Sequence, residues 1–543
     1  MWIEAGGPSA VLNFQFLAGR AKPRRWLCFL LLASQALATV DEGRNAPAPA
    51  SSFFTSPAVH PIAIEIPRRG VTALRREPRK YVPASVRVGG ARYDNVAVHL
   101  KGATGSFRGI DDKPSLTLDF GRFAPGQSLH GLSKIHLNNS VEDRSFLNER
   151  IGTELFLAAG VPAPQATWAM VELNGRRLGL YVLKEGFTAE FLSGHFTSGT
   201  GNLYEGSGAD VTDSLPRDSG PGPNDGADLK RLASAVTEPD LAKRWARLQE
   251  ALDLDRFVSF MAAEVMICHR DGYCLARNNY RIYHDPASDR LVFLPHGMDQ
   301  LFGRADTPIE PHTAGLVATA LLETEPGRQR YRERLQFLHT NVFNVADLTA
   351  KMDRWAAQIQ PVLNRSEARV FRREVSGLKE RIANRHRHLA QQLAAPEPKP
   401  LRFDGGVATL TNWFAVDEPA GGKLERAAAP DGTPSLAIRA GPSTTASWRS
   451  VVRLAPGRYR FEARVRTADV KPLAFGKNRG AGVRVSGTPP PRPYDLVGDR
   501  DWTDLEFEFE VASEKDVEVI AELRAAKGQA WFRLDALRLV QLK

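Results

Sequence analysis

Cysteine, long apolar runs and blocks of like charge are all scarce in this 543-residue chain. Only three cysteines occur, so a disulfide-rich scaffold is excluded. Beyond the N-terminal region no stretch approaches the roughly 20 apolar residues of a membrane-spanning helix, which excludes a multi-span membrane protein. No run of five or six like charges appears, and a net charge of +10 is mild for this length. Nucleic-acid binding is therefore disfavoured, whereas phosphate-bearing or anionic polymeric substrates are compatible with the charge.

What the chain does contain is typical of a globular protein, with 43% hydrophobic and 25% charged residues. At about 150 residues per domain, its length predicts three or four domains. A stiff, proline-rich linker at residues 394–400 predicts one domain boundary. An earlier spacer at residues 39–57, rich in Pro, Ala and Ser, is expected to be disordered.

The N-terminus has the pattern of a signal peptide. Basic residues precede an apolar run over residues 26–33, and small residues follow it. We expect residues 1–38 to be removed on export, which predicts a periplasmic, surface or extracellular protein. The alternative is an uncleaved anchor or a buried helix. Cys28 leaves with the signal, and Cys268 and Cys274 then form either one disulfide or two free buried thiols.

The first half of the remaining chain, residues 58 to about 203, alternates apolar and polar side chains between Gly or Asn turns. This pattern predicts a mainly antiparallel sheet. One helix is expected within it, with Asp143 as the N-cap and Gly160 as the stop. The expected strands are 62–66, 86–88, 96–100, 116–120, 167–173 and 178–183.

An α-rich region is expected next. Residues 206–226 are so rich in Gly, Pro, Asp and Ser that they predict a flexible surface insertion. Helical periodicity then covers much of residues 227–393. The expected elements are helices at 229–235, 241–252 and 255–267, a hairpin at 279–283 and 291–294, and a helical run over 329–393.

After the proline-rich linker, residues 401–543 alternate in almost every segment, which predicts an all-β sandwich. Its aromatic residues Trp448, Tyr494 and Trp502 are candidates for stacking on sugar rings. The alternative is that they belong to the core of the sandwich. The expected strands are 436–439, 458–466, 482–486, 505–511, 517–523 and 531–539.

Two groups of residues in the first half are candidates for phosphate chemistry. A loop containing Gly102 and Gly105 lies between two strands, and Lys113 begins the second of them. Backbone N–H groups of such a loop approach phosphates closely, and a nearby ammonium holds them. A carboxylate on the following helix, Glu149 or else Glu154, would pair with this lysine. The alternatives are ordinary hairpin glycines and solvated surface charges.

A sharper cluster lies in the α-rich region. Asp271 follows an apolar helix, Asn278 and Asn279 enter a strand, and Asp299 follows the next apolar strand. Oxygen ligands at strand ends, together with a carboxylate free to orient a hydroxyl group, suit a Mg²⁺–triphosphate site. Isolated Asp and Asn residues are also common at helix ends and turns. Three together beside so many apolar residues favour the functional interpretation.

The order of these parts closely resembles the spore-coat CotH kinase family over about residues 52 to 345. The resemblance includes the glycine loop, the lysine, the helix glutamate and the later Asp, Asn and Asp residues. The matching motifs are Val98–Gly102, Lys113–Leu116, Leu129–Asn139, Gly160–Pro164, Asn174–Gly175, Gly179–Tyr181 with Glu185, Gly201–Tyr204, Asp271, Asn279–Tyr280 and Pro295–Gly303.

The resemblance implies an α+β, two-lobed protein-kinase-like fold over residues 58–393, with a β-rich lobe (about 58–203) and an α-rich lobe (about 227–393). It also implies an exported atypical kinase that uses ATP and Mg²⁺ to phosphorylate Ser or Thr of a surface or secreted protein. The implied roles are Asp271 as catalytic carboxylate, Lys113 on the phosphates with Gly102 and Gly105, Glu149 paired with Lys113, Glu185 and Phe187 near adenine, and Asn279 or Asn278 with Asp299 as metal ligands.

One departure from the family pattern bears on turnover. The family usually shows two Asp residues separated by one residue, and here Gly297 replaces the first, so that only Asp299 is left. A second hypothesis is therefore a surface protein that has lost turnover and acts through polysaccharide binding by its C-terminal sandwich. A third, closer to the first, is transfer of a nucleotidyl or other group by the same scaffold.

Overall fold

The computed structural model describes residues 52–55, 59–103, 105–221, 223–311, 313–396, 399–418, 421–488, 491–512 and 514–542. The expected signal peptide lies outside the described residues. So does most of the expected spacer, but Ser52–Thr55 form α1, with Phe53 and Phe54 buried. The expectation of disorder is wrong for these four residues, because their aromatic rings pack against the first sheet.

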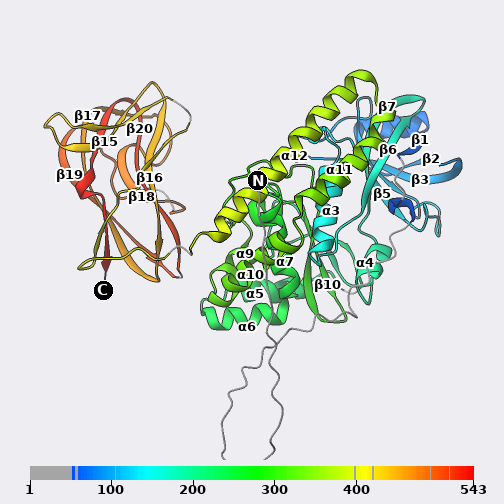
Figure 1. Ribbon diagram of the computed structural model, residues 1–543, viewed down its shortest axis with the longest axis horizontal. Helices are drawn as coiled ribbons and strands as arrows, with labels where there is room; N and C mark the ends of the chain where they lie inside the picture. The colour runs from blue at the N-terminus through cyan, green and yellow to red at the C-terminus, as the bar shows by residue number, and fades with distance from the viewer. Residues whose placement is uncertain are drawn as a thin grey trace, which may run out of the picture. The chain divides into compact units, whose positions relative to one another are not determined.

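The first sheet closes into a seven-stranded barrel, shown in blue to cyan in Figure 1. Its strand order is β1-β2-β3-β4-β5-β7-β6, and only the β1–β6 pair that closes it is parallel. Alternation produces this sheet, because every second side chain enters the barrel core. The strands are β1 (His60–Glu65), β2 (Val82–Val88), β3 (Ala91–Lys101), β4 (Ser115–Asp119), β5 (Lys134–Asn138), β6 (Ala166–Leu173) and β7 (Arg176–Glu185).

Two helices accompany the barrel. Helix α2 (Arg68–Arg76) follows β1 and was not predicted. Helix α3 (Asn148–Ala158) is the predicted helix, but the expected N-cap is wrong: the N-cap is Leu147, and Asp143, four residues earlier, accepts the Asn148 N–H at 3.0 Å from the preceding turn. Helix α3, cyan in Figure 1, contacts β6 on one side and the buried helix α7 on the other. It therefore connects the barrel to the rest of the fold.

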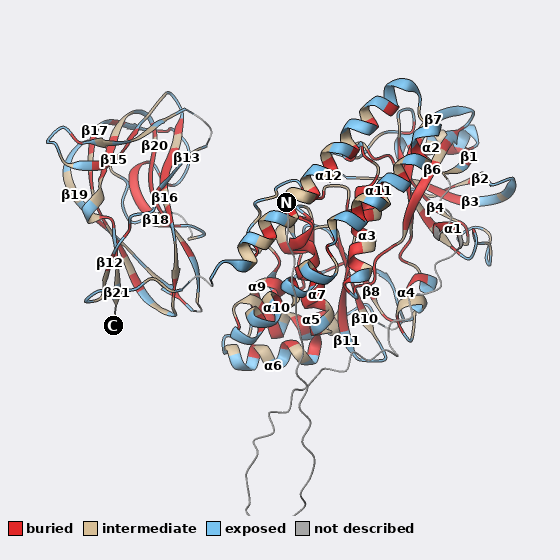
Figure 2. Cartoon of the chain, viewed as in Figure 1, coloured by how far each residue is buried: buried red, intermediate tan, exposed pale blue. Residues whose placement is uncertain are grey.

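The next part, residues 227–394, is helical as predicted, and we call it the helical part. Its central helix α7 is buried along nearly its whole length (Figure 2). The long helix α12 begins with an Asn364–Glu367 capping box. The helices are α5 (Ala227–Val236), α6 (Leu241–Ala251), α7 (Leu254–Met266), α8 (Tyr273–Ala276), α9 (Leu316–Leu322), α10 (Glu325–Asn341), α11 (Val345–Ile359) and α12 (Arg365–Ala394).

A four-stranded sheet, order β11-β10-β8-β9, packs with these helices. The hairpin β10 (Tyr280–Asp285) and β11 (Arg290–Pro295) was predicted, whereas β8 (Leu203–Gly206), β9 (Arg217–Ser219) and helix α4 (Ala189–His195) were not. The predicted flexible insertion at 206–226 is wrong in part. Composition suggested that nothing there is buried, yet Asp210, Val211 and Leu215 are buried.

The remaining strands, from residue 407 to residue 542, form a branched ten-stranded sheet with its own core. The predicted strand over residues 531–539 is broken by a 3₁₀ turn at Leu534–Ala536. The strands are β12 (Val407–Thr409), β13 (Phe414–Asp417), β14 (Lys423–Ala428), β15 (Pro434–Arg439), β16 (Thr444–Leu454), β17 (Gly457–Pro472), β18 (Gly480–Val485), β19 (Gly498–Val511), β20 (Lys515–Arg533) and β21 (Arg538–Leu542).

Two questions left open by the sequence are answered here. Cys268 and Cys274 are free, buried thiols and not a disulfide. Among the described residues no helix is both long and apolar enough to span a bilayer.

Candidate functional site

A pocket of about 780 Å³ is lined by residues of the barrel and of the helical part together. This volume lies in the range of small-molecule and cofactor sites. The barrel contributes one face of β3, β4 and β5 and the loop after β3. The helical part contributes the loop after α7 and the ends of β10 and β11, and the chain just before it contributes the end of β8.

Strand register explains which barrel residues reach the pocket. His99 lies opposite Thr117, Thr117 opposite His136, and His136 opposite Lys184. Residues that face one another across neighbouring strands share a face of the sheet. The same face therefore carries Lys101, two residues after His99, and it is polar although the opposite face fills the barrel core.

Lys101, the last residue of β3, is the pocket lysine nearest the glycine loop. Its Nζ donates to Asn138 Oδ1 at 2.6 Å. Burial, followed by the nearby charge of Lys184, lowers the pKa of Lys101 to about 8, while Glu149 and Asp299 act in the opposite direction. An anion in the pocket would restore the charged form of this ammonium.

The expected Lys113–Glu149 pair is wrong. The Lys113 Nζ donates to the Leu180 carbonyl oxygen at 2.9 Å and lies over the Tyr181 ring, and Lys113 does not line the pocket. Glu149 pairs instead with Lys184 of β7 at 2.7 Å, and both side chains are almost fully buried. Glu154, the other candidate carboxylate, pairs with Arg150 on its own helix.

The glycine loop after β3 is anchored to the pocket wall by Asn139. The Asn139 Nδ2 donates to the carbonyl oxygens of Ser106 and Lys113 at 3.0 and 2.9 Å. Gly102 has φ +104° and lines the pocket. Gly105 also has positive φ but lies beside Glu142 and outside the lining, so only the first of the two predicted glycines reaches the pocket.

The loop between α7 and α8 presents Asp271. Its shape is set from below by buried Glu264, which accepts the N–H groups of Tyr273 and Cys274 at 3.0 and 2.8 Å. The Asp271 Oδ2 accepts Asn278 Nδ2 at 3.0 Å and Asn279 Nδ2 at 2.7 Å. Both predicted amides thus donate to the same carboxylate oxygen, Oδ2 of Asp271.

Asp299 lies in the loop after β11. Its backbone oxygen accepts Asn148 Nδ2 of α3 at 2.8 Å, and neighbouring Met298 packs against Gly152 of α3. Burial, followed by the charges of Glu149 and Glu142, raises the pKa of Asp299 to about 7. A carboxylate in this state gains from a cation placed next to it.

Phe187 lines the pocket just after β7, but Glu185 does not. The Glu185 carboxylate turns away and accepts the Gln165 N–H at 3.1 Å, and burial raises the pKa of Glu185 to about 7. Phe187 contacts His296 and Arg281, two further pocket residues.

The structure thus brings Gly102, Phe187, Asp271, Asn279 and Asp299 to one pocket, but not Lys113, Glu149, Gly105 or Glu185. Sequence reasoning missed four charged or titratable residues at or behind this pocket. A usable signal was present, because polar residues recur at every second position of β3 and β5. The missed residues are Lys101, His136, Lys184 and Arg281.

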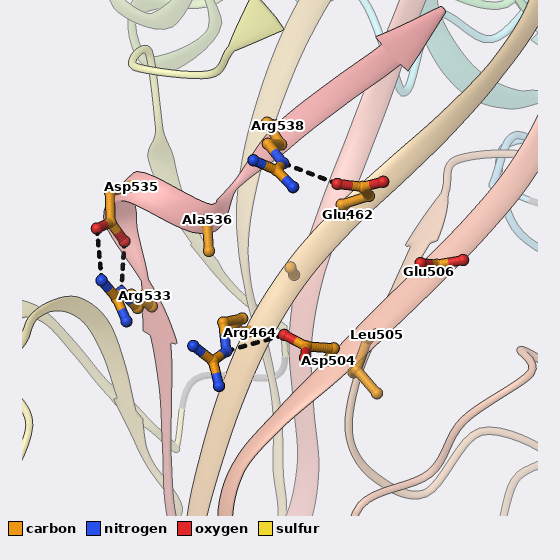
Figure 3. Close-up of a pocket in the computed structure, with 10 residues that line it drawn as sticks. Glu462, Arg464, Asp504, Leu505, Glu506, Arg533, Asp535, Ala536 and Arg538 are labelled. Atoms are coloured by element: carbon orange, nitrogen blue, oxygen red, sulfur yellow. Dashed lines mark hydrogen bonds and ion pairs between the residues drawn. The ribbon is translucent and has the colours of Figure 1, made fainter. Parts of the chain in front are cut away.

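A smaller groove of about 440 Å³ lies on the C-terminal β-sheet, between β17, β19 and the chain around β21 (Figure 3). Its charged side chains are largely paired with one another. The pairs in Figure 3 are Arg538–Glu462 at 2.7 Å, Arg464–Asp504 at 2.8 Å and Arg533–Asp535 at 2.6 Å. Because partners already neutralise these charges, the first pocket is the stronger candidate for an anionic ligand.

The CotH kinase protein family matches residues 98–389, more than half of the chain. The chain belongs to this family. The matched region includes the pocket-lining part of the barrel and most of the helical part. All the residues that the pocket brings together from the glycine loop to Asp299 therefore lie in the CotH kinase region.

Two curated relatives are similar to part of this chain. Invasin CotH2 of Rhizopus delemar is 26% identical over 250 residues, which cover 40% of this chain and 42% of the invasin. Inner spore coat protein H of Bacillus subtilis is 21% identical over 299 residues, covering 50% of this chain and 82% of that protein. The chain thus spans less than half the length of the invasin.

Two solved structures are also similar. The proinflammatory kinase CtkA of Helicobacter pylori is 7% identical, with a TM-score of 0.28, over 54% of this chain and 97% of CtkA. TmCBM61, solved in complex with β-1,4-galactotriose, is 13% identical, with a TM-score of 0.18, over 25% of this chain and 90% of that chain. At these TM-scores neither likeness establishes a fold for the CotH kinase region or for the β-sheet that follows it.

Proposed function

We propose that this protein is an exported protein kinase that transfers the γ-phosphoryl group of ATP to Ser or Thr of a surface or secreted protein. In this proposal the barrel and the helical part are the two lobes of a kinase-like fold. The observation that carries it is convergence: a barrel lysine, Lys101, lines the same pocket as Asp271, Asn279 and Asp299 of the helical part. Membership in the CotH kinase family supports the same reaction class.

The lysine assignments follow the contacts and not the sequence order. Lys101 would bind the phosphates, because its ammonium lines the pocket beside Gly102. Lys184 and Glu149 would have a structural role and would not contact the phosphates, since their buried ion pair fixes α3 against the barrel. Lys113 has no part in the proposed reaction, because its ammonium is engaged with the Leu180 carbonyl oxygen.

Magnesium fits the donors present. No group of three His, Cys, Asp or Glu side chains that could hold a metal alone occurs among the described residues. Mg²⁺ is commonly bound by one or two carboxylates together with substrate phosphates and waters. Here Asp299 would supply the carboxylate, and the amide of Asn279 would supply a further oxygen ligand. When bound, Mg²⁺ neutralises charge on the triphosphate.

Asp271 would act on the acceptor. The two amides donate to its Oδ2, and its Oδ1 would accept the proton of a Ser or Thr hydroxyl. The hydroxyl oxygen then attacks the γ-phosphorus and ADP leaves. Lys101 stabilises the charge on the phosphate oxygens as the bond to ADP breaks.

Label transfer from γ-labelled ATP tests the proposal. Wild type is expected to label a Ser- or Thr-containing protein in the presence of Mg²⁺, and Asp299→Ala is expected to abolish this while the melting temperature is unchanged or higher. Glu77→Gln, at a solvent-exposed ion pair, is the matched control. No transfer by wild type, or equal transfer by Asp299→Ala, would refute the kinase. Label from α-labelled ATP on the acceptor would instead indicate nucleotidyl transfer.

Export and surface attachment are part of the proposal. The apolar N-terminal run supports export, and the relatives named as invasin and spore coat protein support a place at a cell or spore surface. Cleavage is tested by N-terminal sequencing of the secreted protein. A mature protein that begins well before residue 39 would contradict the expected signal peptide.

Polysaccharide binding by residues 401–543, as a carbohydrate-binding-module-like sandwich, is the second candidate. Among the three proposed aromatic residues, Trp448 is wrong, because it is buried and its Nε1 donates to the Ala437 carbonyl oxygen. Tyr494 is 45% exposed, and Trp502 is partly exposed with its Nε1 on Asp431 at 2.6 Å. Loss of glycan retention by the full chain on Trp502→Ala, with Tyr494→Ala tested in parallel, would support this candidate. Unchanged retention by both variants would refute these residues.

A further inference from the structure

Arg281 is a buried cation in the pocket that the proposed phosphoryl transfer does not use. It lies in β10, opposite Glu205 of β8 and Leu294 of β11. Its side chain is 10% exposed, and its Nε and Nη1 have no hydrogen-bond partner among the described residues. Buried guanidinium N–H groups without acceptors are rare in proteins, because each loses its hydrogen bonds to water. A ligand that supplies acceptors would compensate for this loss.

The charge around Arg281 indicates the kind of acceptor. Two carboxylates lie near its ends, Glu205 at 3.4 Å and Asp218 at 3.5 Å. Both are considerably exposed and balance the guanidinium charge; Asp218 is the ion-pair partner of Nη1, whereas the inner Nε has no hydrogen-bond partner among the described residues. A neutral acceptor such as a ring nitrogen suits this balanced cluster better than a further phosphate does. Phosphates are better served by Lys101 near the glycine loop.

The backbone beside Arg281 is largely occupied. At the end of β7 the Glu185 N–H donates to the Gln165 carbonyl oxygen at 2.9 Å, and the Gly186 N–H donates to the Lys134 carbonyl oxygen at 3.1 Å. These two main-chain donors are therefore not free for a base. The side chain of Arg281 offers further donors at this part of the pocket.

Two rings complete the surroundings of Arg281. The Arg281 Cζ lies 5.2 Å from the centroid of the Phe187 ring, and His296 packs edge-on against the same ring at 5.6 Å. His296 Nδ1 also lacks a partner among the described residues. An aromatic ring, a planar cation and an imidazole form a wall suited to a flat heterocycle.

We propose that Arg281 recognises the base of the nucleotide, donating its side-chain N–H groups to the ring nitrogens of a purine. This inference rests on the proposed nucleotide-dependent function and adds the group that reads the base. Recognition then depends in part on a side chain of the helical part. Arg281 touches the nucleotide but takes no part in the bonds that break or form.

The test compares nucleotide with inorganic tripolyphosphate on the full chain. Binding of Mg²⁺–ATP and Mg²⁺–tripolyphosphate is measured by calorimetry for wild type, Arg281→Met and Arg281→Lys. Methionine keeps an apolar stem against Phe187, and lysine keeps the charge without the planar fork. Arg290→Met, at an exposed arginine in the same hairpin, is the matched control.

Both Arg281 variants are expected to bind ATP at least ten-fold more weakly, which corresponds to about 1.4 kcal/mol, and to bind tripolyphosphate within two-fold of wild type. Lys101→Met is expected to weaken both ligands. Wild type should also lose affinity for ATP analogues in which N7 or N3 is replaced by carbon. For at least one of these analogues the Arg281→Met effect should shrink.

Other outcomes overturn the inference. Equal losses for ATP and tripolyphosphate would assign Arg281 to the phosphates, and an unchanged ATP affinity would leave it no role. A melting temperature lowered by Arg281→Met together with loss of both ligands would indicate a structural residue. If ATP and tripolyphosphate both bind but the Arg281 variants do not distinguish them, the inference alone fails. If wild type binds neither ligand, the proposed function fails with it.

Discussion

The buried Lys184–Glu149 pair provides the sharpest test of how the barrel is joined to the rest of the fold. The two side chains are 1% and 2% exposed, and their charged atoms lie 2.7 Å apart. Replacing Glu149 by Met would leave the Lys184 ammonium buried without its anion. Breaking a buried pair on one side costs about 3–5 kcal/mol, whereas an exposed pair contributes about 0–1 kcal/mol. We therefore expect Glu149→Met and Lys184→Met each to lower the free energy of unfolding by about 3–5 kcal/mol.

The double variant separates the pair from its members. Replacing both residues by Met removes the desolvation cost of two charges, so its stability should lie within about 1 kcal/mol of wild type or above it. Urea unfolding followed by tryptophan fluorescence at pH 7 measures all three variants, with exposed Glu77→Gln expected within about 0.5 kcal/mol. A single variant that loses less than about 1 kcal/mol, or a double variant as unstable as the worse single one, would refute this reasoning.

Three further predictions follow from other contacts. The pKa of Glu185 is raised to about 7 by burial, so the folded state holds its proton longer than the unfolded state. Wild type should therefore lose up to about 3 kcal/mol relative to Glu185→Gln as pH rises from about 5 to 8; parallel pH profiles would contradict this. A Cβ on Gly297, at φ +54°, would lie 2.5 Å from Asn279 Oδ1. Gly297→Ala should therefore lower the free energy of unfolding in urea by about 1–3 kcal/mol and reduce phosphoryl transfer. Gly303→Ala, where a Cβ would meet nothing within 4 Å, should do neither. Lys113→Met should leave Mg²⁺–ATP affinity within about two-fold, because its ammonium is bound to the Leu180 carbonyl oxygen and does not line the pocket; a loss comparable to that of Lys101→Met would restore the assignment of Lys113 to the phosphates.

Local pattern was sufficient for most of the elements. Strict alternation predicted β3 and β4, and helical periodicity predicted α3 and α7, because a half-buried element must repeat its apolar residues at its own period. The exceptions had weak local signals. Strand β5 is short, and Val211 and Leu215 are isolated apolar residues in a segment of turn-forming composition. They are buried by packing against residues that are distant in the sequence, and local composition does not reveal such contacts.

The lysine proposed to bind the phosphates, and the lysine that pairs with Glu149, could not be chosen from sequence order alone. Lys101 and Lys113 flank the same glycine loop, so both are close to it along the chain. Closure of the barrel decides between them: it points Lys101 toward Asn138 and the pocket, and Lys113 toward Leu180. Prediction was easier for Asp271, Asn279 and Asp299, because each lies at the end of a buried element and these ends meet at the same edge of the fold.

Gly297 connects the departure from the family pattern with the geometry of the site. Asn279 fills the space that a side chain at residue 297 would need, and its amide is held by Asp271 at 2.7 Å. A carboxylate at residue 297 would also add a further negative charge near Asp299, whose pKa is already raised by burial and by Glu149 and Glu142. The glycine and the asparagine therefore fit one another, and the site has Asp299 as the carboxylate of this loop. Phosphoryl transfer by wild type would show that one carboxylate and one amide are sufficient for the metal. ATP binding without transfer would instead support the alternative of a kinase-like protein that has lost turnover.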